Sequence, residues 1–218
     1  MKYIPFMKKR EYPKISISSL VQRANDLVTL CRSDKGELEQ AGLQWDLVNE
    51  IALLLKECSE ADAKFKILKE NLILERNNLR KFIKDCKNLR SCLAEMIRKS
   101  FHTIGTEVRL PQYYKNWNPE DIVQDLNDLA HICNNSRGEL AKTKFDFTLS
   151  DKAAEVVPEL SHYLAKIKLT QENSVSDAFE YRNKVYNDLY TKMKQICFYG
   201  RRAFWDEPEH RKYYRAVN

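Results

Sequence analysis

Residues 20–38, LVQRANDLVTLCRSDKGEL, recur in altered form as residues 122–140, IVQDLNDLAHICNNSRGEL, at a shift of 102 positions. Nine of the 19 aligned positions are identical, where about one identity is expected by chance at ordinary amino-acid usage. The identities include Cys31 with Cys133 and the final Gly-Glu-Leu of each segment. This similarity predicts that one structural unit occurs twice in the chain.

The repeat extends beyond the quoted segments. The same shift aligns Lys64 with Lys166 and Glu70-Asn71 with Glu172-Asn173, and a change of about four residues then aligns Arg76-Asn77 with Arg182-Asn183. An insertion of this size is best tolerated in a loop. We therefore divide the chain into five expected segments: an N-terminal arm at 1–15, a first repeat at 16–102, a linker at 103–118, a second repeat at 119–205 and a C-terminal tail at 206–218.

The composition indicates an all-α protein. The 218 residues include 5 Gly and 6 Pro, far fewer than ordinary usage, so long uninterrupted helices are expected. A chain of this length buries a sizeable core without needing a metal or a disulfide to hold it.

Three helices are expected in each repeat, which gives a duplicated antiparallel bundle of six. The first helix begins near Ser16 or Ser18, either of which can serve as N-cap, and continues with a kink through Gly36. We expect the second and third helices at 46–71 and 72–102, because one helix over both would span roughly 90 Å at 1.5 Å per residue. The expected counterparts in the second repeat are 119–143, 150–173 and 176–204, with a turn around 170–177 and a kink at Pro158.

The six cysteines predict buried free thiols. Most of them lie at helical spacing among apolar residues, and they include no CxxC pair, which fits a reducing compartment better than a disulfide framework. Cys31 and Cys133 are expected to face the core. The sequence has neither a signal-peptide pattern nor an apolar run of membrane-spanning length, and we expect a soluble cytoplasmic protein.

Positive charge is concentrated in three places. The net charge is +6, and the arm at 1–15 is basic. A cationic stripe is expected on the helix at 72–102, where basic residues fall within a sector about 120° wide at 100° per residue. The stripe consists of Arg76, Arg80, Lys84, Lys87, Arg90 and Arg98. Such a face can follow a phosphate backbone, although most cationic helix faces are simply solvated.

The third basic region is the C-terminal stretch, in which aromatic residues alternate with cations. Its candidate binding residues are Tyr199, Arg201, Arg202, Trp205 and Arg211. Aromatic and cationic side chains together can stack on bases, form hot spots for a protein partner or close the end of the bundle. Since large aromatic side chains gain about 1.5–3 kcal/mol on burial, we expect Phe204 or Trp205 to pack on the protein itself, against the linker or the arm.

Signals for catalysis are weak. Glu159-x-x-His162 matches half of a di-iron motif of helical bundles, but the first repeat has Glu60 opposite His162. We find no phosphate-binding Gly-rich loop, nucleophile motif or zinc spacing.

The sequence therefore predicts a non-catalytic protein-interaction or scaffolding protein without a cofactor or metal, whose partner is another protein. Nucleic-acid binding through the arm, the Arg76–Arg98 stripe and the C-terminal residues is the alternative.

Overall fold

The computed structural model describes residues 16–111 and 118–215, and within these ranges the regular elements are helices, as predicted. The expected basic arm at 1–15 and residues 112–117 of the expected linker lie outside the described residues. The chain divides into two compact units. Unit 1 contains the described residues up to Leu68 and from Val175 onward, and unit 2 is Lys69–Ser174.

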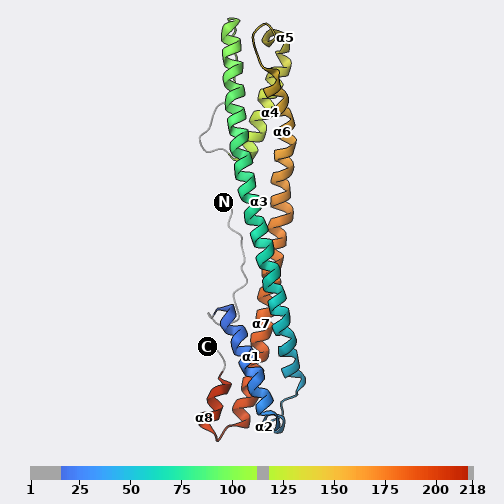
Figure 1. Ribbon diagram of the computed structural model, residues 1–218, viewed down its shortest axis with the longest axis vertical. Coiled ribbons are helices and arrows are strands. Elements are labelled where there is room, and N and C mark those ends of the chain that lie inside the picture. The colour runs from blue at the N-terminus through green and yellow to red at the C-terminus, as the bar shows by residue number, and fades with distance from the viewer. Residues whose placement is uncertain (1–15, 112–117, 216–218) are drawn as a thin grey trace. The chain divides into compact units, whose positions relative to one another are not determined.

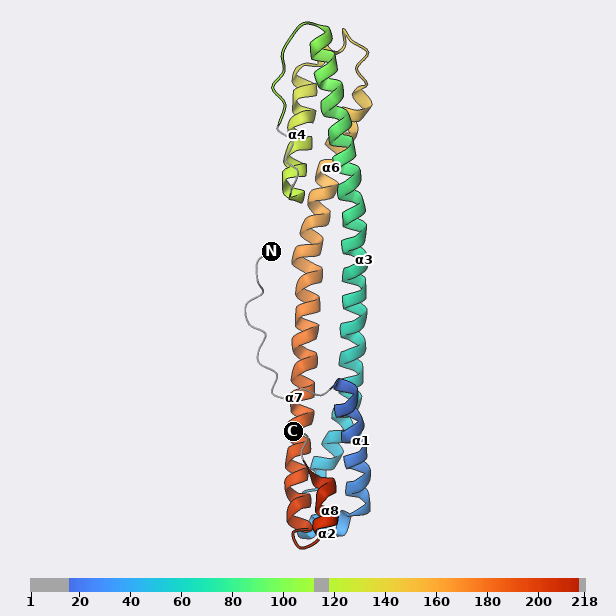
Figure 2. The same ribbon diagram turned by 90° about the vertical axis from the view of Figure 1, so that its left-hand side faces the viewer.

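Unit 1 is assembled from the two ends of the chain. It contains α1 (Ile17–Ser33), α2 (Lys35–Gln40), the first part of α3 (Asp46–Thr103), most of α7 (Glu172–Ala203), α8 (Pro208–Arg211) and the 3-10 turn η2 (Lys212–Tyr214). In Figures 1 and 2, α1 and α2 lie beside the first part of α3 and the last part of α7.

The first helix begins as the sequence predicts. Ser16 is its N-cap, and the Ser16 hydroxyl accepts a hydrogen bond of 3.1 Å from the Ser19 backbone N–H, which satisfies a free amide of the first turn. The expected continuous kinked helix is instead two helices, because the backbone leaves helical geometry at Asp34 (φ −102°, ψ 26°). A turn at Gly42 follows, with φ +94°, a conformation that suits glycine.

Unit 2 contains the remainder of α3 together with α4 (Pro119–Asn135), α5 (Arg137–Leu140), α6 (Phe147–Lys166) and the π-helical turn η1 (Ile167–Gln171). The start of α4 agrees with the expected helix start at 119: Pro119 is at the first helical position, and the backbone N–H of Asn118 donates to Asp121 Oδ2 over 3.0 Å. Pro158 lies inside α6.

The expected division of 46–102 into two helices is wrong, since α3 is continuous from Asp46 to Thr103. The expected break rested on the length that one compact domain allows a helix, whereas residues 46–68 belong to unit 1 and residues 69–103 to unit 2. In the second half of the chain, the expected turn at 170–177 is also helical: η1 leads directly from α6 into α7.

The compact units are not coextensive with the repeats expected from the sequence. Unit 1 combines the first part of the expected repeat at 16–102 with the last part of the expected repeat at 119–205, and unit 2 contains the complementary parts. The helix segments that the sequence places third in each repeat are therefore packed with the first two helices of the other repeat.

Aliphatic and sulfur-containing side chains fill the unit 1 core. In α1, Leu20, Ala24 and Cys31 are fully inaccessible to solvent, and the burial of Cys31 is as predicted. Cys133 in α4 is equally buried, as predicted. All six cysteines are free thiols, and Cys92 alone among them is exposed. Across residues 16–111 and 118–215, no helix combines the length and the apolar character that crossing a membrane requires.

Candidate functional site

The C-terminal segment, residues 204–215, folds back onto unit 1 instead of forming a tail. Its anchor is Tyr214, whose side chain is fully buried and whose hydroxyl donates a 2.7 Å hydrogen bond to Asp34 Oδ2. Asp34 is the residue at which α1 ends and α2 begins. One buried carboxylate therefore ties the C-terminal segment to the break between the first two helices.

The Tyr214 ring packs against α7 at a position that has no side chain, Gly200. A Cβ at Gly200 would lie 2.0 Å from Cδ1 of the Tyr214 ring, so the absence of a side chain is what allows this approach. On its other side the ring is stacked on Phe204, with 5.7 Å between centroids and 13° between the planes. These contacts leave the Tyr214 ring no exposed face.

His210 is the second partner of the buried carboxylate. Its Nε2 lies 2.6 Å from Asp34 Oδ2, and its ring packs 4.0 Å from that of Phe204. Burial raises the pKa of Tyr214 well above its usual range, and the hydrogen bond to Asp34 adds to that effect. The Tyr214 hydroxyl is therefore a proton donor at neutral pH rather than a reactive phenolate.

The structure resolves which of the two predicted aromatics is buried. Phe204 is 6% exposed and Trp205 is 71% exposed, so the prediction that one of them packs on the protein is met by Phe204. Its ring contacts are with His210 and Tyr214. Phe204 thus packs against the segment that was expected to be a C-terminal tail.

The C-terminal candidate binding residues divide into two groups. Arg201 Nη1 donates to the Tyr214 carbonyl over 3.2 Å, and Arg211 Nη1 donates to the Trp205 carbonyl over 3.1 Å. These two arginines therefore stabilise the docked segment as well as presenting charge. Arg202 and Trp205 are exposed, while Tyr199 is half-buried and edge-on to Phe198.

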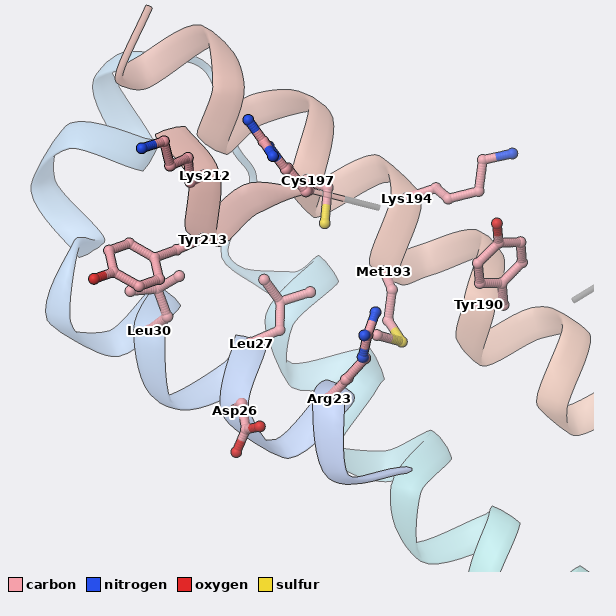
Figure 3. Close-up of a pocket in the computed structure, with 11 residues that line it drawn as sticks. Arg23, Asp26, Leu27, Leu30, Tyr190, Met193, Lys194, Cys197, Lys212 and Tyr213 are labelled. Carbon is pink, nitrogen blue, oxygen red and sulfur yellow. The ribbon is translucent and has the colours of Figure 1, made fainter. Parts of the chain in front are cut away.

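A groove runs between α1, α7 and the C-terminal segment, with a volume of about 460 Å³. Figure 3 shows Leu27 of α1 facing Met193 and Cys197 of α7 along its floor. All three of these side chains are buried. We call this the α1–α7 groove; its apolar floor is continuous with the core of unit 1.

The rim of the α1–α7 groove is cationic and aromatic. Tyr190 and Lys194 lie at one end and Lys212 and Tyr213 at the other (Figure 3). Arg215, from the C-terminal segment, also lines the groove. The remaining rim residues, Arg23, Asp26 and Leu30, come from α1. The sequence predicts a site in the C-terminal stretch but not these α1 residues, because nothing in the sequence shows that residues 208–215 dock beside α1.

A second groove lies on the other side of α7, against the start of α3, with a volume of about 600 Å³. We call it the α3–α7 groove. Lys194 and Tyr199 line it, as does Phe198, which is 56% exposed. Its charge is balanced: Lys192 Nζ lies 2.5 Å from Glu50 Oε2. Two grooves therefore lie along α7, one beside α1 and the other beside the start of α3.

The predicted cationic stripe lies on the unit 2 part of α3 and is weaker than expected. Arg76 is paired with Glu172 over 2.7 Å, and Arg80 Nη1 donates to Asn77 Oδ1 over 3.3 Å. Lys84 is exposed and Lys87 is half-buried.

The assignment of Arg90 to the exposed stripe is wrong. Arg90 is 5% exposed and its Nε lies 2.5 Å from Asp125 Oδ2, while Nη2 donates to the Pro111 carbonyl over 2.9 Å. Burial raises the pKa of Asp125 against the lowering effect of the arginine. The position could have been inferred from helical spacing, because Arg90 is four residues after Cys86 and three before Leu93, which are both in the core.

The described residues include no recognisable metal centre. No group of three or more His, Cys, Asp or Glu side chains in 16–111 and 118–215 is placed to hold a metal ion, and this includes the Glu159-x-x-His162 motif. Comparison of the chain with protein-family models, curated proteins and solved structures yields no match.

Proposed function

We propose that this chain is a non-catalytic helical protein that binds another protein through unit 1. The observation that supports the proposal is the α1–α7 groove, in which an apolar floor of Leu27, Met193 and Cys197 lies beneath cationic and tyrosine side chains. A site that binds through shape and apolar contact needs no reactive group, and buried thiols and a buried phenol supply none at neutral pH.

The docked C-terminal segment exposes two large aromatic side chains. Tyr213, which lines the groove, is 68% exposed, and Trp205, which lies outside the groove lining, is 71% exposed. Aromatic residues, Met and Arg are enriched at interface cores, and Trp, Tyr and Arg dominate binding hot spots. The exposure of such large side chains favours a surface that is covered by a partner.

Site-specific photo-crosslinking tests the proposal. A benzophenone amino acid replaces Tyr213 at the groove rim, and a control variant carries it at Tyr181, an exposed tyrosine of α7 outside the groove lining. After illumination in cells that express the chain, we expect discrete protein adducts from position 213 and not from position 181. Adducts that disappear on nuclease treatment, or equal adducts from both positions, would contradict the proposal.

Nucleic-acid binding is the alternative function. In unit 2, the exposed Arg80, Lys84 and Arg98 on α3 favour it, since a cationic helix face can follow a phosphate backbone. The pairing of Arg76 and the burial of Arg90 reduce the charge available. Titration with single- and double-stranded oligonucleotides at rising salt tests it, because phosphate-driven binding must weaken steeply with salt.

We also propose that the chain is an internal duplication. Matching features support it: α1 and α4 are each 17 residues long, and each is followed after one residue by a short helix. The hydrogen bond from Gln22 to Asp26, 2.8 Å, has a counterpart from Gln124 to Asp128, 2.7 Å.

In this interpretation the two repeats exchange their third helix segments, because each compact unit takes that segment from the other repeat. The proposal has a direct test. The contiguous fragment 69–174, which is unit 2, should fold when expressed alone, whereas 16–102 should not, because unit 1 also needs residues 175–215. Cooperative unfolding of 16–102 would contradict the exchange.

For the cellular location we propose the cytoplasm. The support is the five buried free thiols, which suit a reducing compartment. Imaging of the tagged chain in its own cells tests the proposal, and recovery of the protein from an oxidising compartment would contradict it.

A further inference from the structure

The charge of the α1–α7 groove restricts what it can bind. Its lining contains four cations, Arg23, Lys194, Lys212 and Arg215, and one acid, Asp26. The acid is already engaged, because Asp26 Oδ1 accepts from Gln22 over 2.8 Å. A ligand in the groove therefore meets a net positive rim.

Three of the four cations have no carboxylate partner among the described residues. Lys212 is paired with Glu209 over 2.5 Å, but no ion pair within 16–111 and 118–215 involves Arg23, Lys194 or Arg215. Lys194 has an aromatic contact instead, 5.4 Å from the Tyr190 ring centroid. These exposed cations are available to a carboxylate supplied from outside.

The floor of the groove requires apolar groups from the same ligand. Leu27, Met193 and Cys197 are each at most 5% exposed and expose no charge. Met is a flexible, polarizable side chain that adapts to differently shaped partners. A chain of phosphates would satisfy the rim but would leave this floor unfilled, whereas a peptide provides both carboxylates and aliphatic side chains.

The rim residue Arg23 of unit 1 has a buried, ion-paired counterpart in unit 2. The 102-residue shift pairs Arg23 with Asp125. Asp125 is buried against Arg90 of α3, whereas Arg23 is exposed on the groove rim. The unpaired charge at this position is thus confined to the unit that has the groove.

The basic N-terminal arm is not a complementary occupant. Residues 1–14 contain five Lys and Arg and one Glu, so they carry the same sign as the rim. The complementary occupant is a segment of another protein with the opposite charge.

We propose that the α1–α7 groove binds an acidic peptide segment of a partner protein, with aliphatic or aromatic side chains on the Leu27–Met193–Cys197 floor and carboxylates paired with Arg23, Lys194 and Arg215. This inference rests on the proposed protein-binding function and specifies its partner. Electrostatic complementarity of this kind chiefly sets association rate and specificity, while the apolar contacts hold the complex together.

The test starts from a displayed library of random 16-residue peptides selected against the full chain. We expect the enriched peptides to combine Asp or Glu with Leu, Ile, Met or Phe. One enriched peptide, labelled with fluorescein, then serves as the probe in anisotropy titrations at low and high salt. Failure to enrich any peptide, or enrichment of basic peptides, overturns the proposal.

Two charge-reversal variants locate the binding. The double variant Arg23→Glu with Lys194→Glu alters the rim and should lower the affinity for the labelled peptide at least about tenfold. Arg32→Glu with Lys184→Glu makes the same change in net charge at exposed positions of the same two helices outside the groove lining, and should alter affinity less than about twofold. Thermal melting by circular dichroism checks that both variants remain folded.

The outcomes distinguish a failure of the acidic-peptide proposal from a failure of the proposed protein-binding function. Equal weakening by both variants would show a general charge effect and overturn the groove assignment. If an oligonucleotide displaces the probe at lower concentration than unlabelled peptide, a nucleic acid occupies the groove, and the acidic-peptide proposal is overturned. Protein adducts at position 213 in the crosslinking experiment would still support protein binding if the peptide selection failed, whereas nuclease-sensitive adducts would contradict both.

Discussion

Unit 1 and unit 2 are built on similar helix pairs but bury different polar groups. In unit 2, α3 and α4 are joined by the salt bridge between Arg90 and Asp125. In unit 1, the buried acid is Asp34, which is bound by His210 and Tyr214 of the C-terminal segment. The 102-residue shift aligns Asp34 with Ser136 and Asp125 with Arg23, so neither buried acid has an acidic counterpart.

The comparison teaches that the aligned helices share their apolar positions and differ in their buried polar contacts. Cys31 and Cys133 are both fully buried, as are Leu38 and Leu140. A buried acid must be paired or hydrogen-bonded to be tolerated, and each unit supplies its partner from a different part of the chain. Unit 2 uses a cation from the long helix, and unit 1 uses the C-terminal segment.

The largest effect is expected from breaking the ion pair of unit 2. Arg90→Ala leaves Asp125 buried without its cation, and we expect a loss of about 3–5 kcal/mol in the free energy of unfolding, measured by urea denaturation. Replacing both partners by apolar residues, Arg90→Met with Asp125→Leu, should recover most of that loss. A single variant as stable as the wild type would show that Asp125 is not buried as described.

The second prediction breaks the corresponding contact of unit 1. Tyr214→Ala removes a fully buried ring that is stacked on Phe204, and large-to-small changes at such sites cost about 3–5 kcal/mol. Tyr214→Phe keeps the ring and removes the hydroxyl donor of Asp34, so the loss should be about 1–3 kcal/mol. Trp205→Ala is the control at an exposed aromatic. If Trp205→Ala destabilises the protein more than Tyr214→Ala, the segment does not dock as described.

The same contrast shows what could be predicted from the sequence. The all-α class, the Ser16 cap, the helix start at 119 and the buried Cys31 and Cys133 follow from local composition and helical spacing, and they are confirmed. The continuity of α3 was not predicted, because helix length was judged for one domain and the chain forms two units. The assembly of unit 1 from the two ends of the chain depends on contacts between residues more than 100 positions apart, such as Tyr214 with Asp34.

The candidate site was predicted in part for the same reason. Arg201, Arg202 and Trp205 were identified from composition, and the structure places them next to the docked segment or within it. Arg23 and Lys194 were missed, because a groove rim formed by two distant helices leaves no pattern in either helix. Arg90 was placed on the wrong face because it lies at the edge of the cationic sector, where helical spacing also matches Cys86 and Leu93.

A third prediction compares two helical glycines. Gly200→Ala places a Cβ 2.0 Å from Tyr214, so the ring must move, and we expect a loss of about 1–3 kcal/mol. Gly138 in α5 has open space where an alanine Cβ would lie, with nothing within 4 Å, so Gly138→Ala should gain up to about 1 kcal/mol from helix propensity alone. Denaturation midpoints of the two variants check this, and a gain at Gly200 would contradict the close approach.

The smallest effect is expected in the fall of the free energy of unfolding at alkaline pH, to which the two aligned cysteines, Cys31 and Cys133, contribute. Burial raises the pKa of Cys31 from 9.0 to about 12, with the nearby Cys197 and Asp34 adding to the shift. Burial also raises the pKa of Cys133, but a hydrogen bond with Ser150 opposes it. Both native pKa values are therefore above the unfolded value, and the unfolded state loses these protons first as the pH rises.

The direction in which stability changes with pH follows from this difference between the native and unfolded pKa values. Above about pH 9 the unfolded state binds fewer protons than the native state, so the free energy of unfolding falls with pH, by up to about 1.4 kcal/mol per pH unit for each such thiol. The stability from Cys31 is complete below pH 9 and is lost as the pH rises towards 12. Cys31→Ala should flatten this decline more than Cys133→Ala, and Cys92→Ala, at an exposed position, should leave the slope unchanged. Urea denaturation at several pH values between 8 and 10.5 measures the slopes. A wild-type slope that none of the three variants alters would show that the Cys31 and Cys133 thiols meet the same environment in the folded and unfolded states, contrary to their burial.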